Sequence, residues 1–144
     1  MDHVLGALEA ELAVFYRRAR AVSAELARSV HPELEPAAYA LLVRLAESGE
    51  QRATDIACYF GVGKATMSRQ LRTLEELGLI ERAADPNDRR ASLVRLTAGG
   101  RQRVEQARSA RREQWVRRLS AWERDEVVEL ARLLRRFNEL NAEG

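Results

Sequence analysis

The side chains that could do chemistry gather in two short stretches of the chain, residues 64–72 and residues 88–90. The first, KATMSRQLR, begins with the sole lysine of the chain, Lys64, and contains Arg69 and Arg72. The second is Asp88-Arg89-Arg90. Lysine and arginine offer positive charge and several hydrogen-bond donors, with no acceptor. Both stretches therefore suit the binding of anions or nucleobase edges.

Helical periodicity indicates how the first stretch would present its donors. Met67, Leu71 and Leu74 recur at i, i+4 and i+7, which predicts a helix over residues 64–77 with one buried side. At about 100° per residue the small, hydroxylated and basic side chains point elsewhere. An ordinary solvated helix would mix Glu and Lys on that side, but here glutamates appear only in the last turns. We expect the outward set to read the major groove of DNA: Lys64, Ala65, Thr66, Ser68, Arg69 and Arg72.

A short helix is expected before this one and a hairpin after it. Residues 53–60 read as the short helix, Gly61-Val62-Gly63 as a tight turn, and Gly78 as the residue that ends the second helix. Residues 79–83 and 92–96 read as strands joined by turn residues 85–88 and the charged pair Arg89-Arg90. An arginine on a slim hairpin suits the negative potential of the minor groove. We expect Asp88 to hold Arg90 or to cap the turn; the alternative is an ordinary polar hairpin.

Longer helical patterns flank this central segment. Apolar residues from Leu5 to Leu26 step by 3 and 4, a heptad seam over three repeats. Such a seam either faces the core or is shared between subunits, and we favour the second. A helix over 37–47 follows Pro36. Thr97 is the expected N-cap of a helix to about Leu119, and Ser120 to Glu123 fit a capping box for a last helix.

Charge is distributed unevenly along the 144 residues. Residues 1–60 carry 6 basic and 9 acidic side chains, residues 61–118 carry 14 and 7, and residues 119–144 carry 4 and 6. The positive excess thus coincides with the two stretches above, as an anionic partner would require. Because all other basic residues are arginines, coding bias alone could produce part of this excess.

Several function classes are disfavoured by the sequence. No apolar run approaches the ~18 residues needed to cross a bilayer, and the N-terminus is acidic where a signal peptide should be basic. The single cysteine, Cys58, excludes an internal disulfide. His3 and His31 are too isolated to define a metal site, and we see no phosphate loop or Ser/His/Asp set. We expect a cytoplasmic protein that is not an enzyme and has no cofactor, no metal and no membrane partner.

The whole pattern resembles the MarR family of winged helix-turn-helix transcription regulators. The most specific piece is DPNDRRASLVRLTAGG, residues 85–100, which is similar to the family's wing motif of Asp-x-Arg followed by a strand and Leu-Thr. The resemblance implies a mainly α fold with a small β wing. It places Asp88 and Arg90 on the wing's Asp and Arg, and residues 64–72 on the recognition helix. Gly63 departs from the family, which often has a Ser or Thr helix cap there, so we expect a weaker helix start.

The resemblance also implies an organisation and a mode of action. Residues 1–144 would form one domain, with dimerisation helices in 1–35 and 98–144. The DNA-binding part would be 36–97, made of the helix-turn-helix 53–78 and the wing 79–97. The implied protein is a homodimer on a pseudo-palindromic duplex DNA operator. It often acts as a repressor that a small molecule or an oxidant releases.

Two further sites remain open at the level of sequence. A pocket for a small aromatic effector between the first, second and fifth helices would use Phe15, Tyr16, Arg17, Tyr39 and Trp115, although each residue type is also common in cores and interfaces. Cys58 could act as a thiol-based redox sensor, but only Lys64 offers nearby sequence charge to activate it. The remaining alternative is a winged-helix module that docks on an acidic protein.

Overall fold

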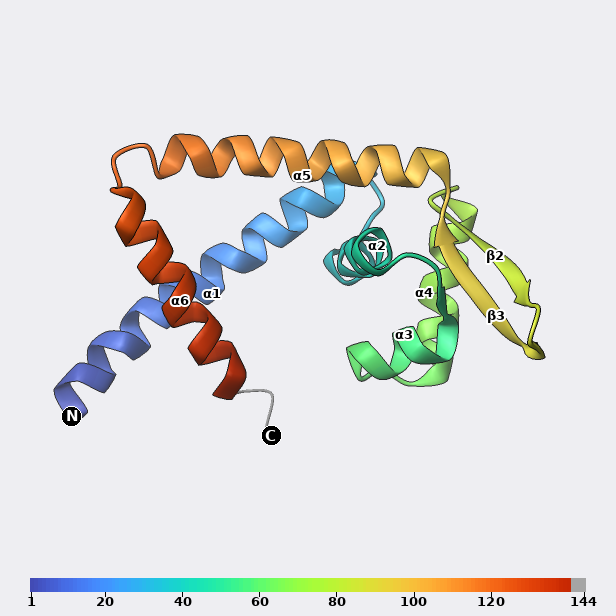
Figure 1. Cartoon of the computed structure of the whole chain (residues 1–144), viewed down its shortest axis with the longest axis horizontal. Coiled ribbons are helices and arrows are strands. Elements are labelled where there is room, and N and C mark those ends of the chain that lie inside the picture. Colours follow the sequence, from blue (N-terminus) through green and yellow to red (C-terminus); the bar gives the residue numbers. More distant parts are fainter. Residues whose placement is uncertain (141–144) are drawn as a thin grey trace. The chain divides into compact units, whose positions relative to one another are not determined.

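The computed structural model describes residues 1–140 and contains six helices and a small antiparallel sheet (Figure 1). Two compact units are separated by the clustering of contacts, residues 1–107 and residues 108–144. In chain order the elements are α1 (Asp2–Val30), α2 (Pro36–Ser48), β1 (Gln51–Arg52), α3 (Ala53–Phe60), α4 (Lys64–Glu76), β2 (Ile80–Asp85), β3 (Asp88–Leu96), α5 (Ala98–Arg118) and α6 (Arg124–Leu140).

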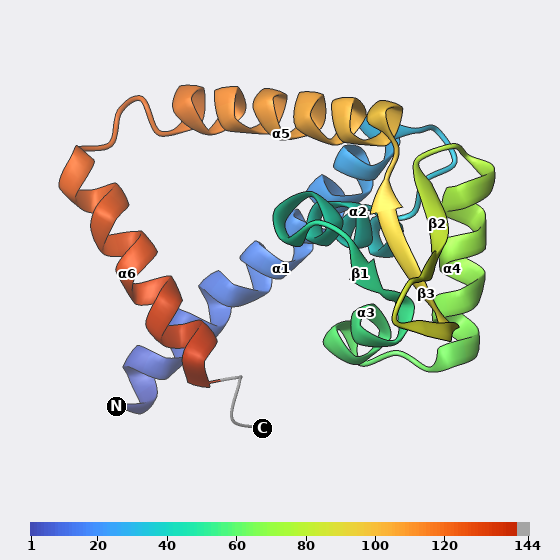
Figure 2. The same cartoon turned by 45° about the vertical axis from the view of Figure 1, so that its right-hand side comes forward.

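The fold class predicted from the sequence is confirmed, and one strand was missed. The sheet has the order β1-β3-β2, and both pairings are antiparallel. In Figure 2, β1 lies beside β3 just ahead of α3. Two residues are too few to show a periodicity of two, so the sequence carries no sign of this strand.

The core of the first unit lies beneath the helix-turn-helix. Leu41, Leu42 and Leu45 of α2 are buried with Ile56 of α3 and with the predicted α4 stripe. The α4 stripe, Met67, Leu71 and Leu74, is 0–2 % exposed, so the opposite side of α4 must face outward. The turn before α4 uses left-handed backbone at Gly61 alone, since Gly63 is extended and forms the N-cap.

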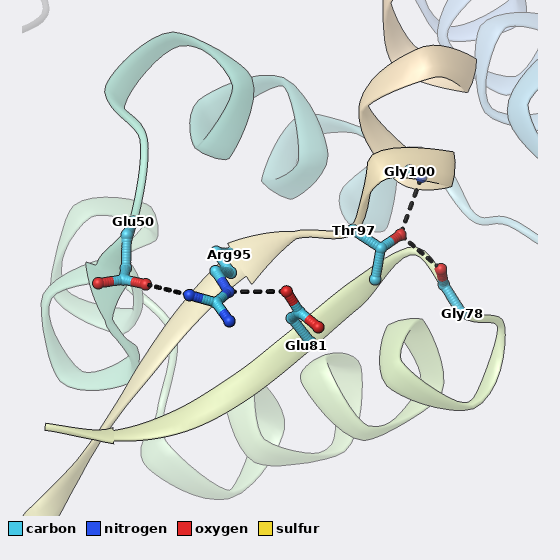
Figure 3. A network of polar contacts seen from close by, with 6 residues as sticks. All are labelled: Glu50, Gly78, Glu81, Arg95, Thr97 and Gly100. Carbon is cyan, nitrogen blue, oxygen red and sulfur yellow. Dashed lines mark hydrogen bonds and ion pairs between the residues drawn. The ribbon is translucent and has the colours of Figure 1, made fainter.

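The junction that follows α4 is built from hydrogen bonds to a few backbone groups. The N–H groups of Gly78 and Leu79 donate to the carbonyls of Glu75 and Leu74, which satisfies the end of the helix. The Thr97 hydroxyl donates to the Gly78 carbonyl at 2.7 Å and accepts from the Gly100 N–H at 2.9 Å (Figure 3). Thr97 is therefore the N-cap of α5, as expected, and it also ties α5 to the end of α4.

The predicted boundaries of the two hairpin strands and of the last helix are wrong. The strands extend to Asp85 and begin again at Asp88, so Arg89 and Arg90 belong to β3 and not to a loop. Exposed polar side chains at the tip conceal the strand pattern. The last helix begins at Arg124, three residues later than the start at residue 121 that a cap at Ser120 predicts. Its start is held instead by the Glu126 carboxylate, which accepts the Glu123 N–H at 2.9 Å.

Apolar side chains remain exposed on α1 and on α6, each considered within its own unit. On α1 the seam residues Leu5, Leu8 and Phe15 are 46–53 % exposed. No residue of α6 is buried, although Leu130, Leu133 and Leu134 are apolar. None of the described helices is both long and apolar enough to cross a membrane.

Candidate nucleic-acid interface

The outward side of α4 carries donors that no other side chain in residues 1–140 engages. Lys64, Arg69 and Arg72 are exposed, and within residues 1–140 none of their side chains has an ion-pair or hydrogen-bond partner. Ala65 and Ser68 are exposed beside them, whereas Thr66 is half-buried. Unpaired cations on one side of a helix are available to an anionic partner at no cost in broken ion pairs.

Lys64 stands at the N-terminus of α4, where the backbone adds to its charge. Gly63 is the N-cap and provides no side chain, so no side-chain hydrogen bond caps this end. The first N–H groups of a helix carry partial positive charge and favour a phosphate when they are free. The weak cap that the sequence predicted therefore leaves donors open beside Lys64.

The hairpin of β2 and β3 is anchored near its tip by a buried carboxylate at the end of β2. Asp85 is 5 % exposed, and its carboxylate lies 2.7 Å from the Arg52 guanidinium of β1. The same carboxylate accepts the Asn87 N–H at 2.9 Å. Asp85 thus fixes both the turn and the link to β1. We assigned it only to the turn, because the missed strand concealed its partner Arg52.

At the hairpin tip the structure decides between the two roles considered for Asp88. Its carboxylate accepts the backbone N–H of Arg90 at 3.0 Å, which caps the turn. No ion pair between the side chains of Asp88 and Arg90 is present among the described residues. The side chains of Arg89 and Arg90 are exposed, and within the part of the chain that the structure describes neither has a hydrogen-bond or ion-pair partner.

A cavity of about 160 Å³ lies between α3, α4 and the hairpin. Lys64 and Ser68 of α4 line it with Arg82 of β2 and Arg90 of β3, and none of the described residues that line it is acidic. Around this cavity the first turns of α4 and the hairpin form one continuous basic surface. Arg82 was not predicted as a site residue. It lies two residues after the buried Ile80 in β2, so the alternation of side chains along a strand places it on the same inward face and could have identified it.

Opposite that surface, the hairpin is braced by a second set of charges. Arg95 of β3 lies 2.7 Å from Glu81 of β2 and 3.5 Å from Glu50 ahead of β1 (Figure 3). The hydrogen bond that the Arg95 guanidinium donates to the Glu81 carboxylate is the main cause that raises the pKa of Arg95 above its ordinary value. These contacts connect β3 to β2 and to the residue just ahead of β1, and they neutralise Arg95, which sets it apart from Arg69 and Arg72 of α4, unpaired among the described residues.

The five residues suggested for an effector pocket are not gathered at one site within the first unit. Tyr39 lines a cavity of about 560 Å³ between α1, α2 and α3, where the Arg44 guanidinium stacks 3.9 Å from the centre of the Tyr59 ring. Phe15 and Tyr16 contact each other edge to face and are about half exposed, and Arg17 is exposed. Trp115 belongs to the second unit, where Arg111 stacks on its ring.

The remaining sequence candidates show little organisation. Cys58 is a free, exposed thiol on α3. Among the described residues no three His, Cys, Asp or Glu side chains are grouped so that they could hold a metal ion.

Comparison with known proteins adds to this geometry. The model of the MarR family matches residues 34–92. The chain is 35 % identical over 131 residues to YxaD of Bacillus subtilis (strain 168), which is named as an HTH-type transcriptional regulator, with 91 % of this chain and 90 % of that protein covered. The crystal structure of RV1404 from Mycobacterium tuberculosis superposes with a TM-score of 0.81 at 28 % identity, covering 93 % and 92 % of the two chains. A crystal structure of MarR gives a TM-score of 0.75 at 26 % identity, covering 94 % and 91 %.

Proposed function

Because the chain belongs to the MarR family of winged helix-turn-helix transcription regulators, we propose that it binds a specific duplex DNA operator as a homodimer in the cytoplasm. The observation that carries this proposal is the outward side of α4. There Lys64, Arg69 and Arg72 are exposed, without an ion-pair partner among the described residues, and the opposite side of the helix is a buried apolar stripe. A helix of this kind fits the major groove, and its cations are in the place where phosphates and base edges would meet it.

Each residue type on this surface suits a different part of the duplex. Arg69 and Arg72 can each donate two hydrogen bonds to the O6 and N7 atoms of guanine. Lys64 and the open N–H groups beside it suit a phosphate, with Ala65, Thr66 and Ser68 leaving room for close approach. On the hairpin, Arg90 and Arg89 suit the minor groove, and Asp88 holds the turn that presents them.

A second copy of the chain would cover the exposed apolar residues of α1 and α6. Leu5, Leu8 and Phe15 of α1, together with Leu130 and Leu134 of α6, are the side chains that we propose to be shared between subunits. Two α4 helices about 34 Å apart would then meet successive major grooves of a pseudo-palindromic site. Sedimentation equilibrium tests this directly, and a stable monomer would refute it.

The decisive measurement is duplex binding over a range of salt concentrations. We expect log affinity to fall linearly with log salt, by about 0.9 for each phosphate neutralised. Arg69→Ala and Arg72→Ala should each lower sequence preference by about 1–3 kcal/mol if the contact is bidentate. Arg28→Ala, which removes an exposed arginine from α1, is the matched control and should change neither quantity.

The wing makes a separate prediction in the same assay. Arg90→Ala should weaken binding and lower the salt slope; an unchanged slope would remove Arg90 from the residues that face phosphates.

The alternative function has its own outcome. If the chain binds an acidic protein and no duplex DNA, the winged-helix module that docks on an acidic protein is favoured.

We propose that the regulator represses and that a small aromatic effector releases it. The cavity lined by Tyr39, Arg44 and Tyr59 supports this part, because it offers ring faces beside a cation. A panel of benzoates and phenols tested for operator release would examine it, with Tyr39→Ala expected to abolish the response. The oxidant alternative fails if Cys58→Ser leaves release by peroxide unchanged.

A further inference from the structure

Arg82 occupies an inward position on the strand beside the recognition helix. It pairs with the buried Val94 across the hairpin and shares the parity of the buried Ile80. Its guanidinium reaches α4 at two points. The Nη2 group donates to the Ser68 carbonyl oxygen at 3.4 Å, and Nε lies 4.0 Å from a carboxylate oxygen of Glu75.

These two contacts converge on the middle of α4. Carbonyl groups of a helix point toward its C-terminus, whereas side chains lean toward its N-terminus. The Ser68 carbonyl and the Glu75 carboxylate, seven residues apart, therefore approach each other at the level of Arg72. In a regular helix the Ser68 carbonyl also accepts the Arg72 N–H. Arg82 thus contacts the turn of α4 that carries Arg72.

The hydrogen bonding of Arg82 is incomplete, which argues against a role in stability alone. Its Nε is buried, and no acceptor within hydrogen-bond distance is present among the described residues. A buried donor without an acceptor is unfavourable for folding. Arg95, on the opposite side of the same hairpin, pairs closely with Glu81 at the surface instead.

We propose that Arg82 is a positioning residue for DNA recognition. It clamps the second and third turns of α4 to β2, which sets Arg69 and Arg72 in register with Arg90 of the wing. This inference rests on the proposed function of α4 as the recognition helix. The planar guanidinium can touch two points at once, whereas a lysine ammonium is a single point charge on a flexible stem.

The test compares Arg82→Lys with Arg95→Lys in the full chain. The probe is the tightest duplex that the parent protein selects from a random-sequence pool, set against a random duplex of equal length. We expect Arg82→Lys to lower the preference for the selected duplex about tenfold, a loss in the range of one good base contact. Affinity for the random duplex should be unchanged. Arg95→Lys should leave both affinities as they are in the parent.

Arg82→Gln separates positioning from direct phosphate contact. A positioning role leaves the salt slope at the parent value, whereas a fall of about 0.9 would make Arg82 a phosphate contact and overturn the inference. All binding is measured well below the melting temperature of each variant. A variant that melts earlier but keeps the parent's preference would reduce Arg82 to a structural residue and also overturn it.

A double-mutant cycle adds a readout of register. Arg69→Ala should cost less preference in the Arg82→Lys background than in the parent, because Arg69 is already displaced there; an equal fold-loss in both backgrounds overturns the inference. The parent protein reports on the proposed function separately. If the parent selects no duplex, both proposals fall. If the parent discriminates and Arg82→Lys discriminates equally, the positioning role alone falls.

Discussion

Replacing Gly100 by alanine should strain the joint between the wing and α5. An ideal Cβ at this position would lie 2.0 Å from the carbonyl oxygen of Leu79, and 2.9 Å from its carbonyl carbon. The neighbour is backbone, so it cannot rotate away as a flexible side chain would. Since real Cβ contacts essentially never fall below 3.0 Å, α5 and the start of the hairpin must separate by about 1 Å.

The cost of that movement follows from what it disturbs. Overpacking a filled site costs about 1–3 kcal/mol. The shift would also stretch the 2.9 Å bond from the Gly100 N–H to Thr97 and the 3.1 Å bond from the Thr97 N–H to the Leu79 carbonyl. We therefore expect Gly100→Ala to lower the free energy of unfolding by about 3 kcal/mol, the upper end of the overpacking range.

Gly99 provides the matched control in the same turn of α5. A Cβ added there meets nothing nearer than the Thr97 hydroxyl at 4.0 Å. Gly99→Ala should be neutral or stabilise by up to about 1 kcal/mol, since alanine favours helix. Urea unfolding monitored by circular dichroism, at one protein concentration, compares the two variants. Equal stability of Gly99→Ala and Gly100→Ala would refute the close approach of α5 to Leu79.

Three further substitutions test contacts that hold the helix-turn-helix and the wing in place. Asp85→Ala should lower the free energy of unfolding by about 2 kcal/mol, since it removes the buried partner of Arg52 and the acceptor for the Asn87 N–H. Urea unfolding measures this change, and an unchanged free energy would show that Asp85 does not anchor the hairpin. Thr97→Val keeps the shape and loses both hydroxyl bonds, so it should cost about 1 kcal/mol in thermal unfolding, whereas Thr97→Ser should cost less. Arg103→Gln removes the 3.1 Å bond to the last carbonyl of α1 and should speed amide exchange near Val30; the same rate in Arg101→Gln and Arg103→Gln would argue against that bond.

The sequence predicted those parts of the fold that repeat over several turns. The α4 stripe of Met67, Leu71 and Leu74 is buried as its spacing required, and Thr97 caps α5. A periodic pattern survives small errors in its boundaries because many residues contribute to it. Single contacts carry no such redundancy. The start of α6 was misplaced because Ser120 to Glu123 match the capping-box pattern, whereas the cap that forms is the bond from the Glu123 N–H to the Glu126 carboxylate, which has no Ser or Thr to mark it.

The candidate interface was harder to predict where it depends on pairs distant in sequence. The outward side of α4 follows from helical geometry alone, and its residues are exposed or half-buried as expected. Arg52 with Asp85 and Arg82 with Ser68 are separated by 33 and 14 residues. The first pair joins β1 to the end of β2, and the second forms where β2 packs against α4, so neither follows from local sequence. Charge by itself does not distinguish these anchoring arginines from the free ones in a chain with 24 basic residues.

The exposed apolar side of α6 also affects how the activity of the regulator would depend on its own concentration. A helix with no buried residue in a single chain gains most of its stability from whatever covers it. If a second copy of the chain covers this helix, folding of α6 and formation of the dimer are one equilibrium. The melting temperature should then fall when the protein is diluted. The population of operator-competent pairs would then grow with the square of chain concentration when chains are scarce. A modest rise in synthesis would thus switch occupancy more sharply than a monomeric regulator could.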